Sequence, residues 1–224
     1  MGLRVVVAVS LQQNNSGIIP DGQLRVILRG MNEIDVFILS EKALVDVVEQ
    51  ITDEQWGMEM PPEFMRKDGK PVTLREIINY HAYDDAWVPD ILAGKTMEEV
   101  GKEKFDGDLL KEDPKGNFKA IADAARAAAK IADLTKTAHL SYGDFPVSEY
   151  LKHITLFRGM RAHDIAKVIG TSTVLPADLV QGMWDEFLPE AEEWRKMGVF
   201  GAKVEVPEDA PLQDKLLALT GRQP

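Results

Sequence analysis

The chain has 224 residues, of which 45% are hydrophobic and 28% are charged, a composition that suits a single domain with a sizeable core. Its net charge of -11 disfavours nucleic acid and anionic membranes as partners, because both would repel it. The sequence contains no run of about 18 apolar residues, so it predicts no membrane span, and we expect the protein in the cytoplasm. The absence of cysteine excludes disulfides, thiolate metal ligands and a cysteine nucleophile.

Residues 1–30 differ in character from the rest of the chain. A valine-rich run over Leu3–Leu11 and a second apolar run over Leu24–Leu28 predict two strands. Turn-forming residues at Gln12–Gly17 and Pro20–Gly22 separate them. We therefore expect an N-terminal β-hairpin that is an extension to the main fold. A hairpin alone is marginal in water, so it would pack on the main fold or on a second copy of the chain.

From Met31 onward, the spacing of apolar residues predicts helices. The second helix begins with a capping box of Thr73 and Glu76, and Gly94 is typical of a C-terminal cap. The predicted elements are, in chain order, a helix over Glu33–Ile51, a loop over Thr52–Pro71, a helix over Thr73–Gly94, a linker over Lys95–Gly116, an alanine-rich helix over Asn117–Lys136 and a helix over Pro146–Gly170.

The rest of the chain is predicted to hold a fifth helix at Pro176–Met197, a short strand at Lys203–Val206 and a terminal helical turn at Leu212–Leu219. Four helices joined by loops favour an antiparallel bundle. We therefore expect an all-α fold with a four-helix bundle over residues 31–170. A C-terminal helical extension over residues 171–224 would pack on this bundle.

Two of the predicted helices carry polar side chains within an apolar stripe, the face marked by residues at alternating spacings of three and four. In the helix over Thr73–Gly94 the stripe consists of Leu74, Ile78, His81, Asp85, Val88 and Leu92. In the helix over Pro146–Gly170 it consists of Val147, Leu151, Ile154, Arg158, Arg161, Ile165 and Val168. Because burying an unpaired charge is costly, we expect the polar members to face one another or to line a pocket.

His81 and Asp85 lie one turn apart and allow two interpretations. An imidazole that a nearby carboxylate orients is typical of metal ligands and of acid–base catalysts. Alternatively, His81 is a core histidine whose hydrogen bonds go to Asp85 or to a backbone carbonyl. The adjacent Asp84 is expected to face solvent.

Arg158 and Arg161 also allow two interpretations. Guanidinium groups suit planar anions, so the two arginines are candidates for holding a carboxylate or phosphate of a ligand. Alternatively, they pair with Asp85 or Asp164 and close the core.

The remaining histidines give weaker signals. His153 shares a strip with Asp164 on the helix over Pro146–Gly170. His163 lies off the apolar stripe and His139 precedes the helix, so both are expected at the surface. The sequence contains no HExxH, GxSxG or Walker pattern, so no common hydrolase or nucleotide-binding motif competes with these candidates.

Several motifs, in this order and spacing, resemble one known group of proteins. They are the loop around Trp56, the run NYHAYDDAW, the run HLSYGDFPVSEYL leading into RAHDIAKVIG, and the ending DKLLALTGRQP. Together they resemble the DinB-like four-helix bundle superfamily, and within it the mycothiol-dependent maleylpyruvate isomerase branch of actinobacteria. The resemblance covers Glu33–Pro224 and leaves residues 1–30 unmatched.

The resemblance implies a divalent metal, often zinc or nickel, held by one histidine on the second helix and two ligands a turn apart on a later helix. His81 matches the first ligand. An alignment on Asp164 and the two residues after it places the other ligands at Phe157 and Arg161, which cannot bind a metal. An alignment on Arg158 recovers His153 as a ligand but again meets Phe157. The implied site is therefore incomplete, since a catalytic metal needs about three protein ligands.

The sequence and the resemblance lead to the hypothesis of a protein that binds a small anionic or thiol-linked molecule, such as mycothiol, at the centre of the bundle. The expected binding residues are Asp85, Arg158, Arg161 and Asp164, and His81 is the candidate for acid–base work in a thiol-dependent isomerase or transferase.

The alternative is a non-catalytic, stress-related binding or dimerisation protein, acting as a homodimer. The same residues would then form a buried salt-bridge network. A substrate-sized cavity reaching His81 would favour the first hypothesis, and a filled core would favour the second.

Overall fold

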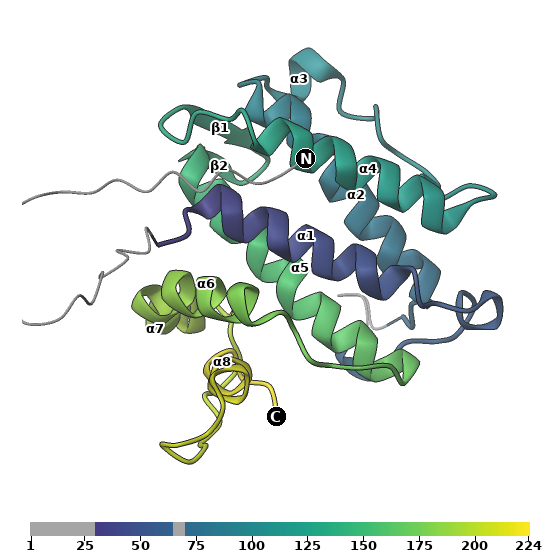
Figure 1. The fold of residues 1–224 in the computed structure, drawn as a ribbon. Coiled ribbons are helices and arrows are strands. Elements are labelled where there is room, and N and C mark those ends of the chain that lie inside the picture. Colours follow the sequence, from purple (N-terminus) through teal and green to yellow (C-terminus); the bar gives the residue numbers. More distant parts are fainter. Residues whose placement is uncertain (1–29, 65–69) are drawn as a thin grey trace, which may run out of the picture. The chain divides into compact units, whose positions relative to one another are not determined.

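The computed structural model describes residues 30–64 and 70–224 (Figure 1). Residues Met31–Pro224 form one compact unit. The hairpin expected within residues 1–30 lies outside the described residues. The described part is mostly helical, as the sequence predicts, and it also holds a small two-stranded antiparallel sheet that the sequence did not predict. None of its helices is long and apolar enough to cross a lipid bilayer.

Four long helices carry most of the core. They are α1 (Glu33–Val48), α2 (Leu74–Leu92), α4 (Pro114–Ala129) and α5 (Val147–Ile169). The shorter elements are η1 (Asp53–Gln55), η2 (Pro62–Phe64), α3 (Met97–Val100), β1 (Thr137–Leu140), β2 (Gly143–Pro146), α6 (Ala177–Phe187), η3 (Leu188–Glu190), α7 (Ala191–Lys196) and α8 (Leu212–Leu219).

The long helices pack around shared apolar side chains. In Figure 1, α1 lies between α4 and α5, and it contacts both, while α2 packs on α4. One cluster of buried residues takes Phe37 from α1, Trp87 from α2, Ala125 from α4 and Leu151 from α5. The alanines of α4 are small, so its neighbours approach closely and the core closes. The hydrophobic periodicity therefore predicted the inward face of α2 correctly, and that of α5 except for Arg161 and Val168, which are only partly buried.

The start of α2 agrees with the predicted capping box. The Thr73 hydroxyl accepts a hydrogen bond from the backbone N–H of Glu76 at 3.2 Å, and the Glu76 carboxylate accepts one from the Thr73 N–H at 2.8 Å. Gly94 has a φ of 77°, the left-handed conformation expected after a helix end. These local interactions explain why the predicted boundaries of this helix were nearly correct.

The segment before α5 differs from the prediction. The alanine-rich helix ends at Ala129, not at Lys136, and its first turn begins at Pro114 because Asp113 caps it. The chain then forms a hairpin in which Thr137 pairs with Pro146 and Leu140 with Gly143. Its strands are too short to show an alternating hydrophobic pattern, and this explains why the sequence predicted a loop here.

The C-terminal third also differs in detail. The fifth predicted helix is broken into α6, η3 and α7, because Pro189 has no backbone N–H to continue the ladder. The strand expected at Lys203–Val206 does not form; this stretch has no regular secondary structure, and the Val204 N–H donates instead to the Ala218 carbonyl of α8 at 3.1 Å. Helix α8 coincides with the predicted terminal turn. The linker expected over Lys95–Gly116 contains α3.

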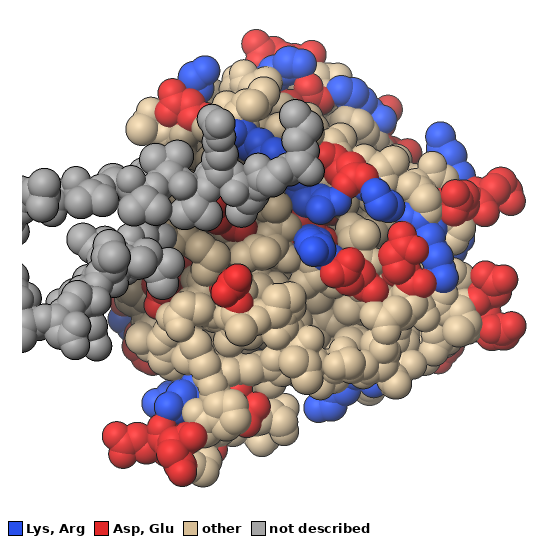
Figure 2. Space-filling model, in the orientation of Figure 1, with Lys and Arg blue, Asp and Glu red and all other residues tan. Residues whose placement is uncertain are grey.

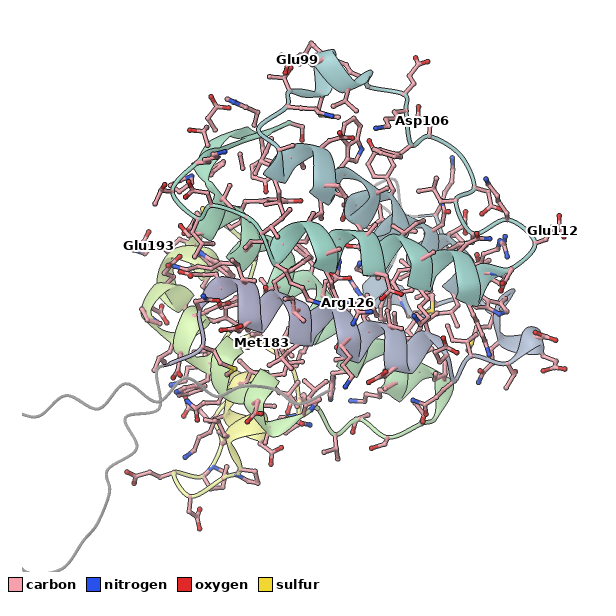
Figure 3. The ribbon with its side chains drawn as sticks, turned by 45° about the horizontal axis from the view of Figure 1, so that its top comes forward. Glu99, Asp106, Glu112, Arg126, Met183 and Glu193 are labelled. Atoms are coloured by element: carbon pink, nitrogen blue, oxygen red, sulfur yellow. The ribbon has the colours of Figure 1, made fainter. Side chains whose placement is uncertain are left out.

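The elements α6 to α8 pack on the long helices. Helix α6 contacts α1 and α5, and α8 contacts α6. Gly159 of α5 allows a close contact with α6, because a Cβ atom there would overlap the Sδ atom of Met183. Figure 3 labels Met183 and shows how side chains fill the space between the ribbons.

Candidate functional site

The centre of the molecule holds a buried charged cluster around Arg158. The Arg158 side chain is only 1% exposed, and its Nε–H lies 2.8 Å from Oδ1 of Asp85 and 3.0 Å from Oε1 of Glu41. Its Nη2 also donates to Asp85, and its Nη1 donates to Nδ1 of His81 at 3.2 Å. These four residues, from α1, α2 and α5, are called the Arg158 cluster below.

Glu41 was not among the predicted site residues, although a sequence signal for it exists. It lies four residues after Phe37 and three before Leu44, which both belong to the apolar stripe of α1. It therefore interrupts the stripe of α1 just as His81 and Asp85 interrupt that of α2.

The two carboxyl groups of the Arg158 cluster compete for one guanidinium. Burial, reinforced by repulsion from Asp85, raises the pKa of Glu41 well above its ordinary value, and Arg158 opposes this only in part. Burial also raises the pKa of Asp85, whereas Arg158 lowers it. Because both carboxyl groups approach the same N–H, a single proton on Glu41 relieves their repulsion. The cluster then contains one positive and one negative charge.

His81 is neutral in this setting. Burial, followed by the positive charge of Arg158 and then of Arg161, lowers the pKa of His81 well below its ordinary value. Since Nδ1 accepts a hydrogen bond from Arg158, the ring proton lies on Nε2. The imidazole is only 1% exposed.

Asp84 lies at the outer edge of the cluster and does not simply face solvent as predicted. Its side chain is 32% exposed, and its Oδ2 lies 3.7 Å from Nη1 of Arg158. Burial raises the pKa of Asp84 to about 6, although Arg158 lowers it. The rotation of α2 against α5 decides this partial burial, and the spacing along one helix cannot reveal it.

Arg161 and Asp164 lie apart from the Arg158 cluster. The Arg161 guanidinium lies over the ring of Phe64, 4.5 Å from its centroid, and 3.9 Å from Oδ2 of Asp164. Arg222, from the C-terminal segment, binds both oxygens of Asp164 at 2.9 Å. Asp85 therefore pairs with Arg158 and not with Arg161. Arg222 lies outside any periodic element, so no sequence pattern pointed to it.

The other histidines take structural positions. Nε2 of His153 lies 3.2 Å from Oε1 of Glu149 and its Nδ1 lies 3.3 Å from the Tyr142 hydroxyl. His139 belongs to β1 and contacts Asp144 at 2.9 Å. His163 was expected at the surface but is only 6% exposed. Its Nδ1 lies 3.3 Å from Oδ1 of Asp164.

The residues present do not fit the zinc or nickel site that the resemblance implies. Nδ1 of His81 is occupied by an N–H of Arg158, and Phe157 and Arg161 offer no ligand atom. Within residues 30–64 and 70–224, no three His, Asp or Glu side chains are arranged to hold a metal ion.

Two cavities lie away from the Arg158 cluster. One, of about 300 Å³, is lined mainly by residues of α6 and η3, and the other, of about 160 Å³, by residues of α5 and the C-terminal segment. Neither is lined by His81, Asp85 or Arg158, because the guanidinium fills the space between α2 and α5. On the face drawn in Figure 2, basic and acidic side chains are interspersed in the upper and right parts, and much of the lower half carries neither.

Comparison of the chain with models of known protein families, with curated proteins and with solved structures gives no match. The likeness to the DinB-like superfamily therefore stays a prediction.

Proposed function

We propose that this protein binds a small organic anion with an apolar body, and that Arg161 holds the anionic group. The site is the smaller cavity, called the Arg161 pocket below. It is lined by Leu156, Phe157, Met160, Arg161, Val199, Phe200 and Arg222. A few polar groups in a mainly apolar wall are typical of small-molecule sites. Its volume of about 160 Å³ suits a ligand smaller than a typical drug molecule.

The state of Arg161 is the observation that carries this proposal. Its side chain is only 25% exposed, yet the carboxylate nearest to it among the described residues is 3.9 Å away. Burial lowers the pKa of Arg161, and the charge of Arg222 adds to this, whereas Asp164 opposes it only in part because no carboxylate of the described residues comes closer than 3.9 Å. An anionic group of a ligand would supply the missing hydrogen bonds.

The charges around the Arg161 pocket point the same way. Hydrogen bonds from His163 and Arg222 hold the pKa of Asp164 at about 2 despite its burial, so it is ionised at neutral pH. Arg161 and Arg222 then leave one net positive charge beside the apolar wall.

The Arg158 cluster supports the interpretation of a buried salt-bridge network. Each of its charged groups is bonded to another, and neither cavity reaches it. A reaction catalysed by His81 would need the imidazole to touch the ligand, and Arg158 covers its Nδ1. We therefore propose binding without catalysis as the main function, and a thiol-dependent isomerase or transferase as the second candidate.

The resemblance extends the proposal. The four long helices would form a DinB-like antiparallel bundle, and thiol-linked molecules, such as anionic conjugates of mycothiol, would be a further class of ligand of which only the anionic group would enter the Arg161 pocket. The protein would bind this small molecule in the cytoplasm. The alternative is that its partner is a second copy of the chain, in a homodimer.

Titration calorimetry with benzoate, and with its uncharged analogue benzamide, tests the proposal. We expect benzoate to bind and benzamide to bind at least tenfold more weakly, because only benzoate can accept the charge-assisted bond. Arg161→Gln should reduce benzoate binding by a similar factor. Arg75→Gln is the matched control, since Arg75 pairs with Asp108 outside the pocket. Equal binding of benzoate by the Arg161 variant would overturn the proposal.

A further inference from the structure

Arg161 and Asp164 lie one turn apart on α5, yet they do not form a close ion pair. Opposite charges three residues apart on a helix are neighbours and attract each other. Nη1 of Arg161 nevertheless lies 3.9 Å from Oδ2 of Asp164, although both side chains are largely buried. A small rotation of either side chain would close this gap. Another group therefore holds the Asp164 carboxylate away from Arg161.

Arg222 is the group that holds Asp164. Its Nε–H and an Nη2–H donate to Oδ1 and Oδ2 of Asp164, each at 2.9 Å, so one guanidinium binds both carboxylate oxygens. Nδ1 of His163 also lies 3.3 Å from Oδ1. A bidentate pair of arginine and carboxylate fixes the orientation of the carboxylate as well as its position. Asp164 is thus bound to the C-terminal segment and not to Arg161.

The end of α8 determines where Arg222 lies. The Arg222 N–H donates to the Leu217 carbonyl at 2.8 Å and the Gly221 N–H to the Ala218 carbonyl at 3.1 Å, which is the pattern of a Schellman motif. Gly221 has a φ of 88°, the left-handed conformation that this motif requires. The remaining guanidinium nitrogen of Arg222, Nη1, donates to the Thr220 hydroxyl at 3.1 Å. Each of its three guanidinium nitrogens therefore has a partner within the protein.

The charge that the Arg161 pocket offers to a ligand depends on this arrangement. While Arg222 pairs with Asp164, the positive charge of Arg161 has no anion in direct contact among the described residues. Without Arg222, Arg161 would be the guanidinium nearest to Asp164, and the two charges would cancel. An incoming anion would then have to displace Asp164 from Arg161.

We propose that Arg222 is a positioning residue of the Arg161 pocket, which binds Asp164 and so keeps Arg161 free for the anionic group of a ligand. Asp164 is, in this arrangement, a competitor of the ligand that Arg222 holds off. The inference rests on the proposed function of the pocket. It gives Arg222 an indirect role, since the nitrogens of Arg222 already have partners.

Calorimetry with benzoate on four full-length proteins tests the proposal: the wild type, Arg222→Gln, Asp164→Asn and the double variant. Arg222→Gln should weaken benzoate binding by about tenfold, because Asp164 then pairs with Arg161. Asp164→Asn should bind benzoate at least as tightly as the wild type, because the competitor is gone. The double variant should return to within about threefold of the wild type, since Arg161 is free again and the net charge of the pocket is restored.

Recovery in the double variant distinguishes a positioning role from two other roles of Arg222. If Arg222 bound the ligand directly, or only held the C-terminal segment in place, the double variant would bind benzoate no better than Arg222→Gln. That result would overturn the proposal, and so would equal binding by Arg222→Gln and the wild type. Arg75→Gln is the matched control, because it breaks an ion pair with Asp108 outside the pocket and should leave binding unchanged.

A second measurement needs no ligand and separates this inference from the proposed function. Urea unfolding of Arg161→Gln, Asp164→Asn and their double variant gives the coupling between these two residues. We expect the coupling to be small in the wild-type background and to increase when Arg222→Gln is added, because only then does Asp164 pair with Arg161. A wild type that binds no benzoate would contradict the proposed function alone. A coupling that Arg222→Gln leaves unchanged would contradict the role of Arg222.

Discussion

At the scale of single residues, Arg158 determines the charge balance of the core. It is the largest fully buried side chain in the described part of the chain, and it bonds to Asp85, Glu41 and His81. Without it, carboxyl groups on α1 and α2 would face each other in an environment that cannot solvate them. Its removal should therefore cost more free energy than the loss of its packing alone.

A double-mutant cycle on Asp85 and Arg158 measures this coupling. Arg158→Ala should lower the free energy of unfolding by about 3–5 kcal/mol, because it leaves a buried carboxylate uncompensated. Asp85→Ala should cost less, because Glu41 can then lose its proton and pair with Arg158 in place of Asp85. The double variant should lose less than the sum of the two. Arg161→Ala is the control, and it should cost about 1 kcal/mol or less since its ion pair is long and partly exposed. Urea unfolding measures the free energies of unfolding. Additive losses for the Asp85 and Arg158 variants would contradict a buried ion pair between these residues.

Glu186 predicts a distinct dependence of stability on pH. Burial raises its pKa from 4.5 to about 8, so the folded state keeps a proton that the unfolded state releases between these values. Stability should therefore fall as pH rises through this range. Glu186→Gln cannot ionise, so it should be more stable than the wild type by about 1–3 kcal/mol near pH 8.5 and nearly equal near pH 5. Urea unfolding at both pH values measures the difference in the free energy of unfolding between the variant and the wild type. The same difference at pH 5 and pH 8.5 would contradict a raised pKa of Glu186.

At the scale of elements, the contact between α5 and α6 depends on the absence of a side chain. Gly159 lies in the middle of α5, where glycine is unfavourable for helix formation, yet it admits Met183 of α6. The C-terminal elements can therefore pack directly on the long helices.

Gly159→Ala should destabilise the protein by about 1–3 kcal/mol, although alanine is the better helix former, because the new Cβ atom would overlap the buried Met183. Gly57→Ala is the matched control. Its Cβ would meet nothing within 4 Å, and its backbone does not require glycine, so we expect no loss. Thermal unfolding compares the two variants, and equal midpoints would show that α6 adjusts its packing freely.

At the scale of the whole molecule, the buried residues of the described chain all lie within Met31–Pro224. They form two apolar clusters, and the second of these involves each of the long helices. The C-terminal segment belongs to the same unit, since Leu216, Leu217 and Leu219 of α8 are buried in the first cluster.

Deletion of residues 1–30 should leave a cooperatively folding protein. We expect its thermal midpoint to shift by less than about 4 °C, the change that about 1 kcal/mol produces in a domain of this size. Removal of residues 212–224 is the contrasting control and should lower the midpoint much further, because it strips the buried leucines of α8. Circular dichroism follows both transitions. Loss of the cooperative transition in the variant without residues 1–30 would show that the fold requires these residues.

The amino-acid sequence by itself determined the four long helices, the capping box of α2, and the inward positions of His81, Asp85 and Arg158. These depend on the spacing of residues along one helix, which acts over a few turns. Only the tertiary structure decided that Arg158 pairs with Asp85 and Glu41. It also decided that Arg161 packs on Phe64 near Asp164, and that Arg222 forms an ion pair with Asp164. Partner choice depends on which helices become neighbours and how each is rotated, and no local pattern encodes this.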